Sequence, residues 1–321
     1  MAARTPVPSS TLLGIGLKLT ATFLFAVMLA LAKSYSMYTV AQLVFFRSFF
    51  ALIPLMVWLL MRGDFPRALH TKRLGAHLVR SIAGIGSMFC MFTSYILLPL
   101  ADATALGYAA PLIITLLAAY FLGERMSALR WGAVALGFCG VLVMLSEHLG
   151  APAPGAPPRS AVGATFALVG AFLVAIAMVQ TRRLTKTEDT GAITFYFQAT
   201  TTIAGAIALT TAALWPATWP AASIINAQAW IAPTIAHWVP LILIGIFGGV
   251  GQIFMTQGYR YADASVLAIF DYSSLLFAVA IGFALFGDVP TSRVVLGASI
   301  VIAAGLAVVW QEHRLRRRAR A

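Results

Sequence analysis

The sequence Ala101–Asp102–Ala103–Thr104–Ala105–Leu106 returns about half a chain later as Ala262–Asp263–Ala264–Ser265–Val266–Leu267. Each copy opens an apolar segment, and each of those segments ends in a glycine followed by an acid, at Gly123–Glu124 and at Gly287–Asp288. A repeat of this length in an apolar chain indicates that a membrane-spanning unit has been duplicated.

The composition places the chain in a membrane. Apolar residues make up 60% of its 321 residues and charged residues 10%, against roughly a quarter charged in a soluble domain. The charges are segregated, so that windows of about 20 residues, enough to cross about 30 Å of hydrocarbon as a helix, hold none or one. Runs such as Leu112–Leu122 are apolar on every face, which excludes a β-barrel with alternating sides. We predict an all-α, multi-pass integral membrane protein.

The apolar segments predict ten transmembrane helices. They cover residues 12–32, 39–61, 78–97, 103–122, 131–148, 161–181, 190–214, 238–258, 264–286 and 294–311. The Pro- and Gly-rich sequence within 149–160 cannot be helical, so it is predicted to link a first five-helix repeat, 12–148, to a second, 161–311. Because five is odd, the second repeat inserts inverted relative to the first, an arrangement that builds a site near mid-membrane.

Loop charges predict the orientation. Of the 22 lysines and arginines, sixteen fall on one predicted side and three on the other, which places both termini in the cytoplasm. The basic tail, 312–321, directly follows the last span and has no interleaved aromatic residues. We therefore expect it to contact anionic lipid and not nucleic acid.

The combination of motifs resembles the drug/metabolite transporter superfamily, and specifically its ten-span carriers built from two EamA domains. The resemblance covers about residues 12–311. It rests on the duplicated motif and on four further features: Lys33 closing the first span, FFRS (Phe45–Ser48), FLGER (Phe121–Arg125) and LFGD (Leu285–Asp288). Asp288 stands where the family often has Glu. The resemblance implies a secondary transporter of a small organic metabolite, such as an amino acid, vitamin, nucleoside or S-adenosylmethionine-like solute, in the bacterial inner membrane.

Two charged residues inside predicted spans are the main site candidates. Arg47 lies about eight residues into its span, where an unpaired cation costs several kcal/mol. It either anchors an anionic or carbonyl group of the solute or bonds to helix-end carbonyls as a structural arginine. Asp271 lies beside Phe270 and Tyr272. It either carries a proton or pairs with a cationic solute, or else it pairs with Arg47 or ends a helix beside a break.

Polar side chains elsewhere in the spans are expected to face the bundle interior. Those expected either to contact the solute or to serve packing between helices are Gln252, Gln198, Tyr272, Tyr108 and Tyr95. Residues predicted to break helices or act in gating are Pro54, Pro111, Gly248, Gly249 and Gly251. The prolines would either kink a helix where the cavity forms or be tolerated kinks. The glycines would either let a helix unwind or let backbones approach closely.

Several other residues are given structural roles. Lys18 and Arg80 lie near span ends and are expected to extend to the membrane surface. Glu147 and His148 are expected at the opposite interface. In each Gly-acid step the glycine is expected to end one helix and the acid to stabilise the start of the next. Both cysteines, Cys90 and Cys139, are expected to be small core residues.

Other functions are weaker. An intramembrane aspartyl protease would need Asp271 and Asp288 in one site, but they stand about 24 Å apart along a helix. Serine-protease, zinc and Walker A motifs are absent from the sequence, so we expect no enzyme activity, metal or cofactor. A non-transporting membrane scaffold remains an alternative. The cargo, the direction of transport and the assembly, for which a homodimer is one option, are left open.

Overall fold

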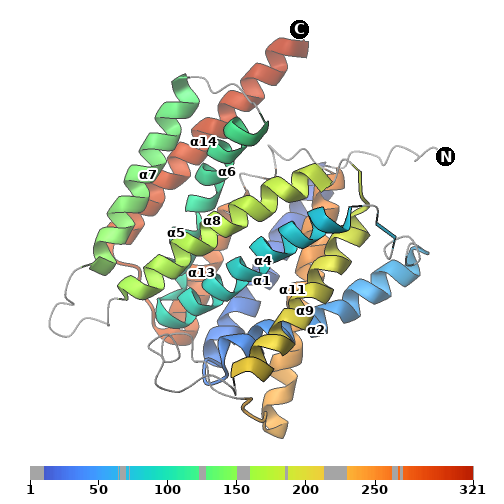
Figure 1. Cartoon of the computed structure of the whole chain (residues 1–321). Coiled ribbons are helices and arrows are strands. Elements are labelled where there is room, and N and C mark those ends of the chain that lie inside the picture. The colour runs from blue at the N-terminus through green and yellow to red at the C-terminus, as the bar shows by residue number, and fades with distance from the viewer. Residues whose placement is uncertain are drawn as a thin grey trace, which may run out of the picture.

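The computed structural model describes residues 11–63, 65, 70–71, 73–122, 128–149, 160–184, 187–212, 230–261, 267 and 270–320. Within these ranges the chain forms helices and connecting turns, with no strand (Figure 1). Three predicted features lie wholly or mostly outside them: the Gly123–Glu124 step, the second copy of the repeated motif and the linker within 149–160.

The helices divide between the two predicted repeats. The first contains α1 (Thr11–Ser34), α2 (Val40–Met61), α4 (Leu74–Leu97), α5 (Leu100–Gly107), α6 (Ala109–Leu122) and α7 (Ala128–Leu149). The second contains α8 (Ala161–Leu184), α9 (Thr190–Ala212), α11 (Ile235–Tyr261), α13 (Ser273–Phe286) and α14 (Ser292–Arg320). Eight segments are long and apolar enough to span a membrane, and two shorter apolar helices lie at Ser273–Phe286 and Ser292–Ala307. These ten segments correspond to the ten predicted spans.

The two repeats pack against each other in a symmetric pattern. Helix α1 packs on α11, and α4 packs on α8, so the first span of each half meets the third span of the other. The second spans, α2 and α9, meet each other, as do the fifth spans, α7 and α14, which lie side by side in Figure 1. If the two repeats are exchanged, the α1–α11 contact becomes the α8–α4 contact, and the α2–α9 and α7–α14 contacts are unchanged. This symmetry is expected for a duplicated unit.

Two predicted spans are discontinuous. The span predicted at 103–122 is divided into α5 and α6 by a turn at Tyr108, and the one predicted at 264–286 contains a turn at Tyr272, just before α13. The break predicted at Pro111 is therefore misplaced by three residues. Pro111 lies in the first turn of α6, where a backbone N–H has no helical partner to lose.

The helices do not break at the other predicted positions, and the gating role of these residues stays a prediction. Helix α2 continues through Pro54, and α11 continues through Gly248, Gly249 and Gly251. These glycines instead permit close packing, the second of the two roles proposed for them. A Cβ on Gly249 would lie 2.6 Å from Pro54 Cγ, and one on Gly251 would lie 3.0 Å from the Phe25 ring. Small residues at such contacts let membrane helices approach closely.

The apolar core joins both repeats. Its largest cluster includes Tyr95 on α4, Leu106 on α5, Met144 on α7 and Ala278 on α13. Many large apolar side chains point outward instead, such as Leu142 and Leu276, as the lipid-facing surface of a membrane protein requires. Cys139 is also exposed, so its assignment to the core is wrong.

Candidate functional site

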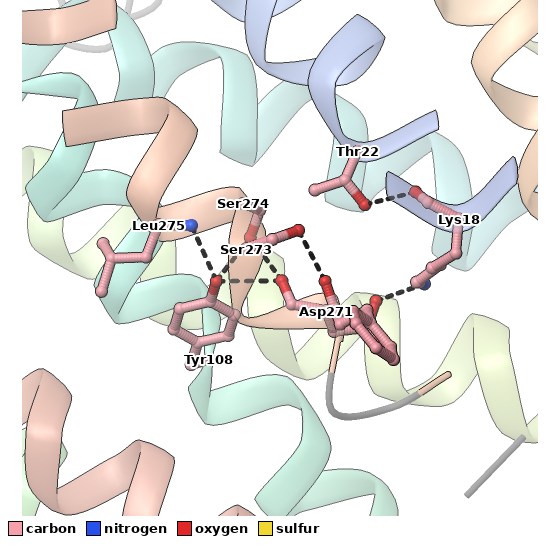
Figure 2. A network of polar contacts seen from close by, with 8 residues as sticks. Lys18, Thr22, Tyr108, Asp271, Ser273, Ser274 and Leu275 are labelled. Atoms are coloured by element: carbon pink, nitrogen blue, oxygen red, sulfur yellow. Dashed lines mark hydrogen bonds and ion pairs between the residues drawn. The ribbon is translucent and has the colours of Figure 1, made fainter. Parts of the chain in front are cut away.

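An ion pair joins the two repeats beside the second helix break. The ammonium of Lys18 on α1 pairs with Oδ1 of Asp271, which precedes α13 (Figure 2). The Lys18 side chain is only 1% exposed, whereas that of Asp271 is 41% exposed. The expectation that Lys18 extends to the membrane surface is therefore wrong. Helix α11 covers α1 here, because Gly258 allows its backbone to approach Gly14 and Lys18.

Tyr108 links the two helix breaks. Its hydroxyl accepts a hydrogen bond from the backbone N–H of Leu275 at 3.1 Å and donates to the carbonyl of Asp271 at 3.2 Å. The same hydroxyl bonds to Ser274 Oγ (Figure 2). Leu275 is in the first turn of α13, and the N-cap residue of that helix, Tyr272, provides no side-chain cap. Tyr108 from the first repeat thus caps a helix of the second.

The predicted tyrosines gather at this junction. The rings of Tyr108 and Tyr272 lie 5.2 Å apart between centroids, at 54°. Tyr95 is buried in the apolar cluster that also contains Tyr108, and Tyr272 packs against that cluster. The hydroxyl of Tyr272 lies against Gly305 on α14. The structure therefore brings together Asp271 and all three tyrosines proposed from the sequence.

Arg47 occupies a separate position, between α2, α9 and α11. It is 6% exposed, and its Nη1 donates to Oε1 of Gln198 at 3.1 Å. Its ion pair with Asp271, one of the alternatives considered, is not formed, because Asp271 pairs with Lys18. Within the described residues, Arg47 Nε and Gln198 Nε2 are buried without a hydrogen-bond partner.

Helix α11 forms one wall beside Arg47. A Cβ on Gly248 would lie 3.2 Å from Arg47 Nε, so any residue larger than glycine would crowd this nitrogen. Gln252 is half-buried one turn further along the same helix, on the face that Gly248 shares. Arg47, Gln198 and Gln252, three residues proposed for solute contact, therefore belong to neighbouring helices.

Charged residues also gather at the end of α1 opposite Lys18. Lys33 pairs with Asp288 at 2.9 Å, and Asp288 Oδ2 accepts a hydrogen bond from the N–H of Leu100 at 3.4 Å. Gly287, in the left-handed region at φ 68°, ends α13 as expected. Asp288 acts at the start of α5, however, and not at the start of the next helix in the chain as expected.

Two buried residues nearby correct another expectation. Glu147 and His148 are 8% and 5% exposed, so they are not interfacial. His148 Nε2 lies 3.4 Å from Asp102 Oδ2, and Glu147 Oε2 lies 3.7 Å from Arg293 Nε. The acid of the first repeated motif is therefore buried in a polar cluster of α5 and α7.

Arg80, which is expected to extend to the membrane surface, is half-buried and bonds to two neighbouring helices. Its Nε donates to Thr181 Oγ1 at 2.8 Å and its Nη1 to the Ile193 carbonyl at 3.4 Å, while its guanidinium covers the Phe197 ring. Unlike Arg47, Arg80 therefore has a set of structural partners. Among the described residues, no group of three or more His, Cys, Asp or Glu side chains could hold a metal ion.

The fold defines a class: helical membrane proteins built from two packed repeats of five segments each. The model of the EamA-like transporter family matches residues 12–146 and 161–310, which are the two repeats. The chain belongs to the EamA-like transporter family.

Named relatives are transporters. The chain is 29% identical to the pseudopaline exporter CntI of Pseudomonas aeruginosa over 92% of its own length and 95% of that protein. It is 28% identical to a riboflavin transporter of Rhizobium johnstonii, over 78% and 75% of the two chains. It is 24% identical to an S-adenosylmethionine uptake transporter of Rickettsia prowazekii, over 85% and 84%. The chain is therefore related to transporters and not to enzymes.

A solved crystal structure shares the fold. It superimposes with a TM-score of 0.62 and covers 96% of this chain and 98% of its own, at 19% sequence identity. At this identity the likeness concerns the fold alone.

Proposed function

We propose that the protein is a secondary carrier that moves a small organic metabolite across the bacterial inner membrane by alternating access. The family and the relatives named as transporters support transport of a small solute. One relative is named an exporter and another an uptake transporter, so both directions are compatible with this fold. The arginine-rich tail and the loop charges support cytoplasmic termini and contact with anionic lipid.

The observation that carries the mechanism is the Lys18–Asp271 pair at the junction of the two repeats. In a carrier the two halves rock against each other, so contacts between them must exchange. Breaking an ion pair is costly where one of its charges is buried, as the Lys18 ammonium is. Movement of α1 away from α13 would therefore break this pair and open the Asp271 carboxylate to another partner.

Asp271 is the partner that a solute or proton can reach. Its side chain is 41% exposed, whereas Lys18 is almost fully buried. The backbone beside Asp271 is fixed by the Tyr108 and Ser274 hydroxyls, so the position of the carboxylate depends on both helix breaks. We propose that a proton or a cationic group of the solute replaces Lys18 at Asp271 during the transport cycle.

The test is metabolite profiling inside and outside cells that express the wild type or Asp271→Asn at matched membrane levels. Asp271→Asn keeps the shape of the side chain but removes its negative charge, to which Lys18 and, in the proposal, the proton or solute bind in turn. We expect wild type to redistribute at least one compound and Asp271→Asn to reduce that redistribution by about tenfold or more, the equivalent of about 1.4 kcal/mol. Arg293→Gln is the matched control, since Arg293 is 58% exposed in its own ion pair.

The outcomes separate the parts of the proposal. If transport by Asp271→Asn equals that of wild type at every external pH, Asp271 is not the coupling group. If wild type redistributes nothing in several growth media, the scaffold interpretation replaces the carrier.

A further inference from the structure

We infer that Arg47 and Gln198 form a binding site for a single carboxylate group of the transported solute. This inference rests on the proposed carrier function and names the class of solute that it moves. The site lies between α2, α9 and α11 and is distinct from the Lys18–Asp271 junction.

The first argument is the charge of Arg47. Its side chain is 6% exposed, and within the described residues no carboxylate lies within ion-pair distance of it. Its one described hydrogen bond leaves from Nη1 to a neutral amide oxygen, that of Gln198. An arginine is always charged, and a buried cation without a counter-ion is strongly unfavourable. The site therefore favours an anion.

The second argument is the set of hydrogen bonds left unmade. Arg47 Nε and Gln198 Nε2 are both buried donors without a partner in the described part of the chain. Since Gln198 turns its oxygen toward Arg47, its amide N–H groups are left to donate. Both unmade bonds need an acceptor, and neither can be satisfied by a donor such as an ammonium group.

The third argument is shape. Because Nη1 is engaged, the Nε–Nη2 edge of the guanidinium is the one without a described hydrogen bond. Two parallel N–H groups on one edge match the two oxygens of a carboxylate. Gly248 faces that edge, and a Cβ there would lie 3.2 Å from Nε. Any larger residue at this position would place a Cβ against Nε, so glycine leaves this edge of the guanidinium without that contact.

The fourth argument concerns the number of charges. One guanidinium and one neutral amide carry a single positive charge, and the neighbouring Met28 and Gly248 are uncharged. One carboxylate neutralises the site, whereas a phosphate dianion would leave a net negative charge in a low-dielectric interior. The site therefore selects a monoanionic group.

A structural role for Arg47 makes the opposite prediction for stability. If Arg47 only held the bundle together, Arg47→Met would unfold at a lower temperature. If it awaits an anion, Arg47→Met should be as stable as wild type or more stable without solute, because a buried charge without a counter-ion is replaced by an apolar side chain of similar length. Arg80→Met is the matched control. Arg80 has described partners on α8 and α9, so its loss should lower the unfolding temperature.

The experiment combines metabolite profiling with thermal unfolding of the purified full chain, for wild type, Arg47→Met, Arg47→Lys, Gln198→Leu and Arg80→Met. We expect every solute redistributed by wild type to carry a carboxylate. Arg47→Met should reduce that redistribution by about tenfold or more, and Arg47→Lys, which keeps the charge but not the two-pronged edge, by less. The identified carboxylate should raise the unfolding temperature of wild type, and its methyl ester should not.

Failure of this inference is distinguishable from failure of the carrier function. Redistribution of solutes that lack a carboxylate, or unchanged carboxylate transport by Arg47→Met, would overturn the site while the carrier stands. Destabilisation of Arg47→Met comparable to that of Arg80→Met would also overturn it, in favour of a structural arginine. If wild type redistributes no solute at all, the carrier function itself fails.

Discussion

Lys33 Nζ lies 2.9 Å from Asp288 Oδ2, and this ion pair joins the end of α1 to the turn after α13. The same ammonium donates to the carbonyl of Leu98 at 2.9 Å, and the same carboxylate oxygen accepts from the N–H of Leu100 at 3.4 Å. Both ends of the α4–α5 connection are therefore tied to one ion pair between the two repeats. The ion pair therefore ties α1, the α4–α5 connection and the turn after α13 together at this end of the bundle.

Asp288→Asn should loosen this end. The substitution removes the charge but keeps an oxygen for the N–H of Leu100, and we expect it to lower the free energy of unfolding by about 1–3 kcal/mol. Amide hydrogen exchange of the Leu98–Leu106 segment should be faster in the variant, as measured by mass spectrometry in lipid nanodiscs. Arg293→Gln is the control, because a pair with one exposed partner contributes about 0–1 kcal/mol. Equal effects of the two substitutions would contradict the assignment.

Tyr108→Phe tests the cap between the helix breaks. Loss of the hydroxyl removes one of two acceptors of the Leu275 N–H, which also donates to the carbonyl of Tyr272 at 3.2 Å. We therefore expect a cost of about 0.5–1.5 kcal/mol. Transport should fall in parallel, since the same hydroxyl holds the backbone at Asp271. Unfolding in denaturant and solute uptake into proteoliposomes measure the two effects. Unchanged stability and uptake in Tyr108→Phe would contradict the cap.

The general architecture could be predicted from the sequence because lipid imposes a simple rule. Segments that cross it must be helical and apolar for about 20 residues, so the ten spans, their grouping and the family were all accessible. The positions of Tyr108 and Tyr272 at helix breaks were not. A break depends on hydrogen bonds to side chains of another segment. The N–H of Leu275, for example, donates to the hydroxyl of Tyr108, and no local sequence pattern encodes that partner.

The pairing of charges was predictable only in part. Arg47 and Asp271 stood out as charges inside spans, but they are not each other's partners. The position of Lys18 near a span end predicts a surface location, whereas its burial depends on the close approach of α11 at Gly258. The presence of Lys18 and Asp271, of opposite sign within two predicted spans, was the available signal for their pairing.

Gly249→Ala tests whether the glycines of α11 serve packing. A Cβ at this position would lie 2.9 Å from the carbonyl oxygen and 3.0 Å from the Cα of Ala51, and backbone atoms cannot move aside as a side chain can. We expect overpacking to cost about 1–3 kcal/mol. Gly132→Ala on α7 meets no atom within 4 Å and should stabilise by up to about 1 kcal/mol through helix propensity. Unfolding of both variants in one detergent measures the difference, and a neutral Gly249→Ala would contradict the packing role.

Gly305 and Tyr272 provide a test of the second helix break. A Cβ on Gly305 would overlap the Tyr272 hydroxyl and lie 2.9 Å from the ring carbon that carries it. Gly305→Ala should therefore displace the tyrosine from the turn before α13, cost about 1–3 kcal/mol of stability and reduce transport. Tyr272→Phe removes the overlapping oxygen, so the double variant should be more stable than the sum of the single effects by about 0.5–3 kcal/mol. A double-mutant cycle in denaturant unfolding measures this coupling. Strict additivity would show that α14 does not fix the position of Tyr272.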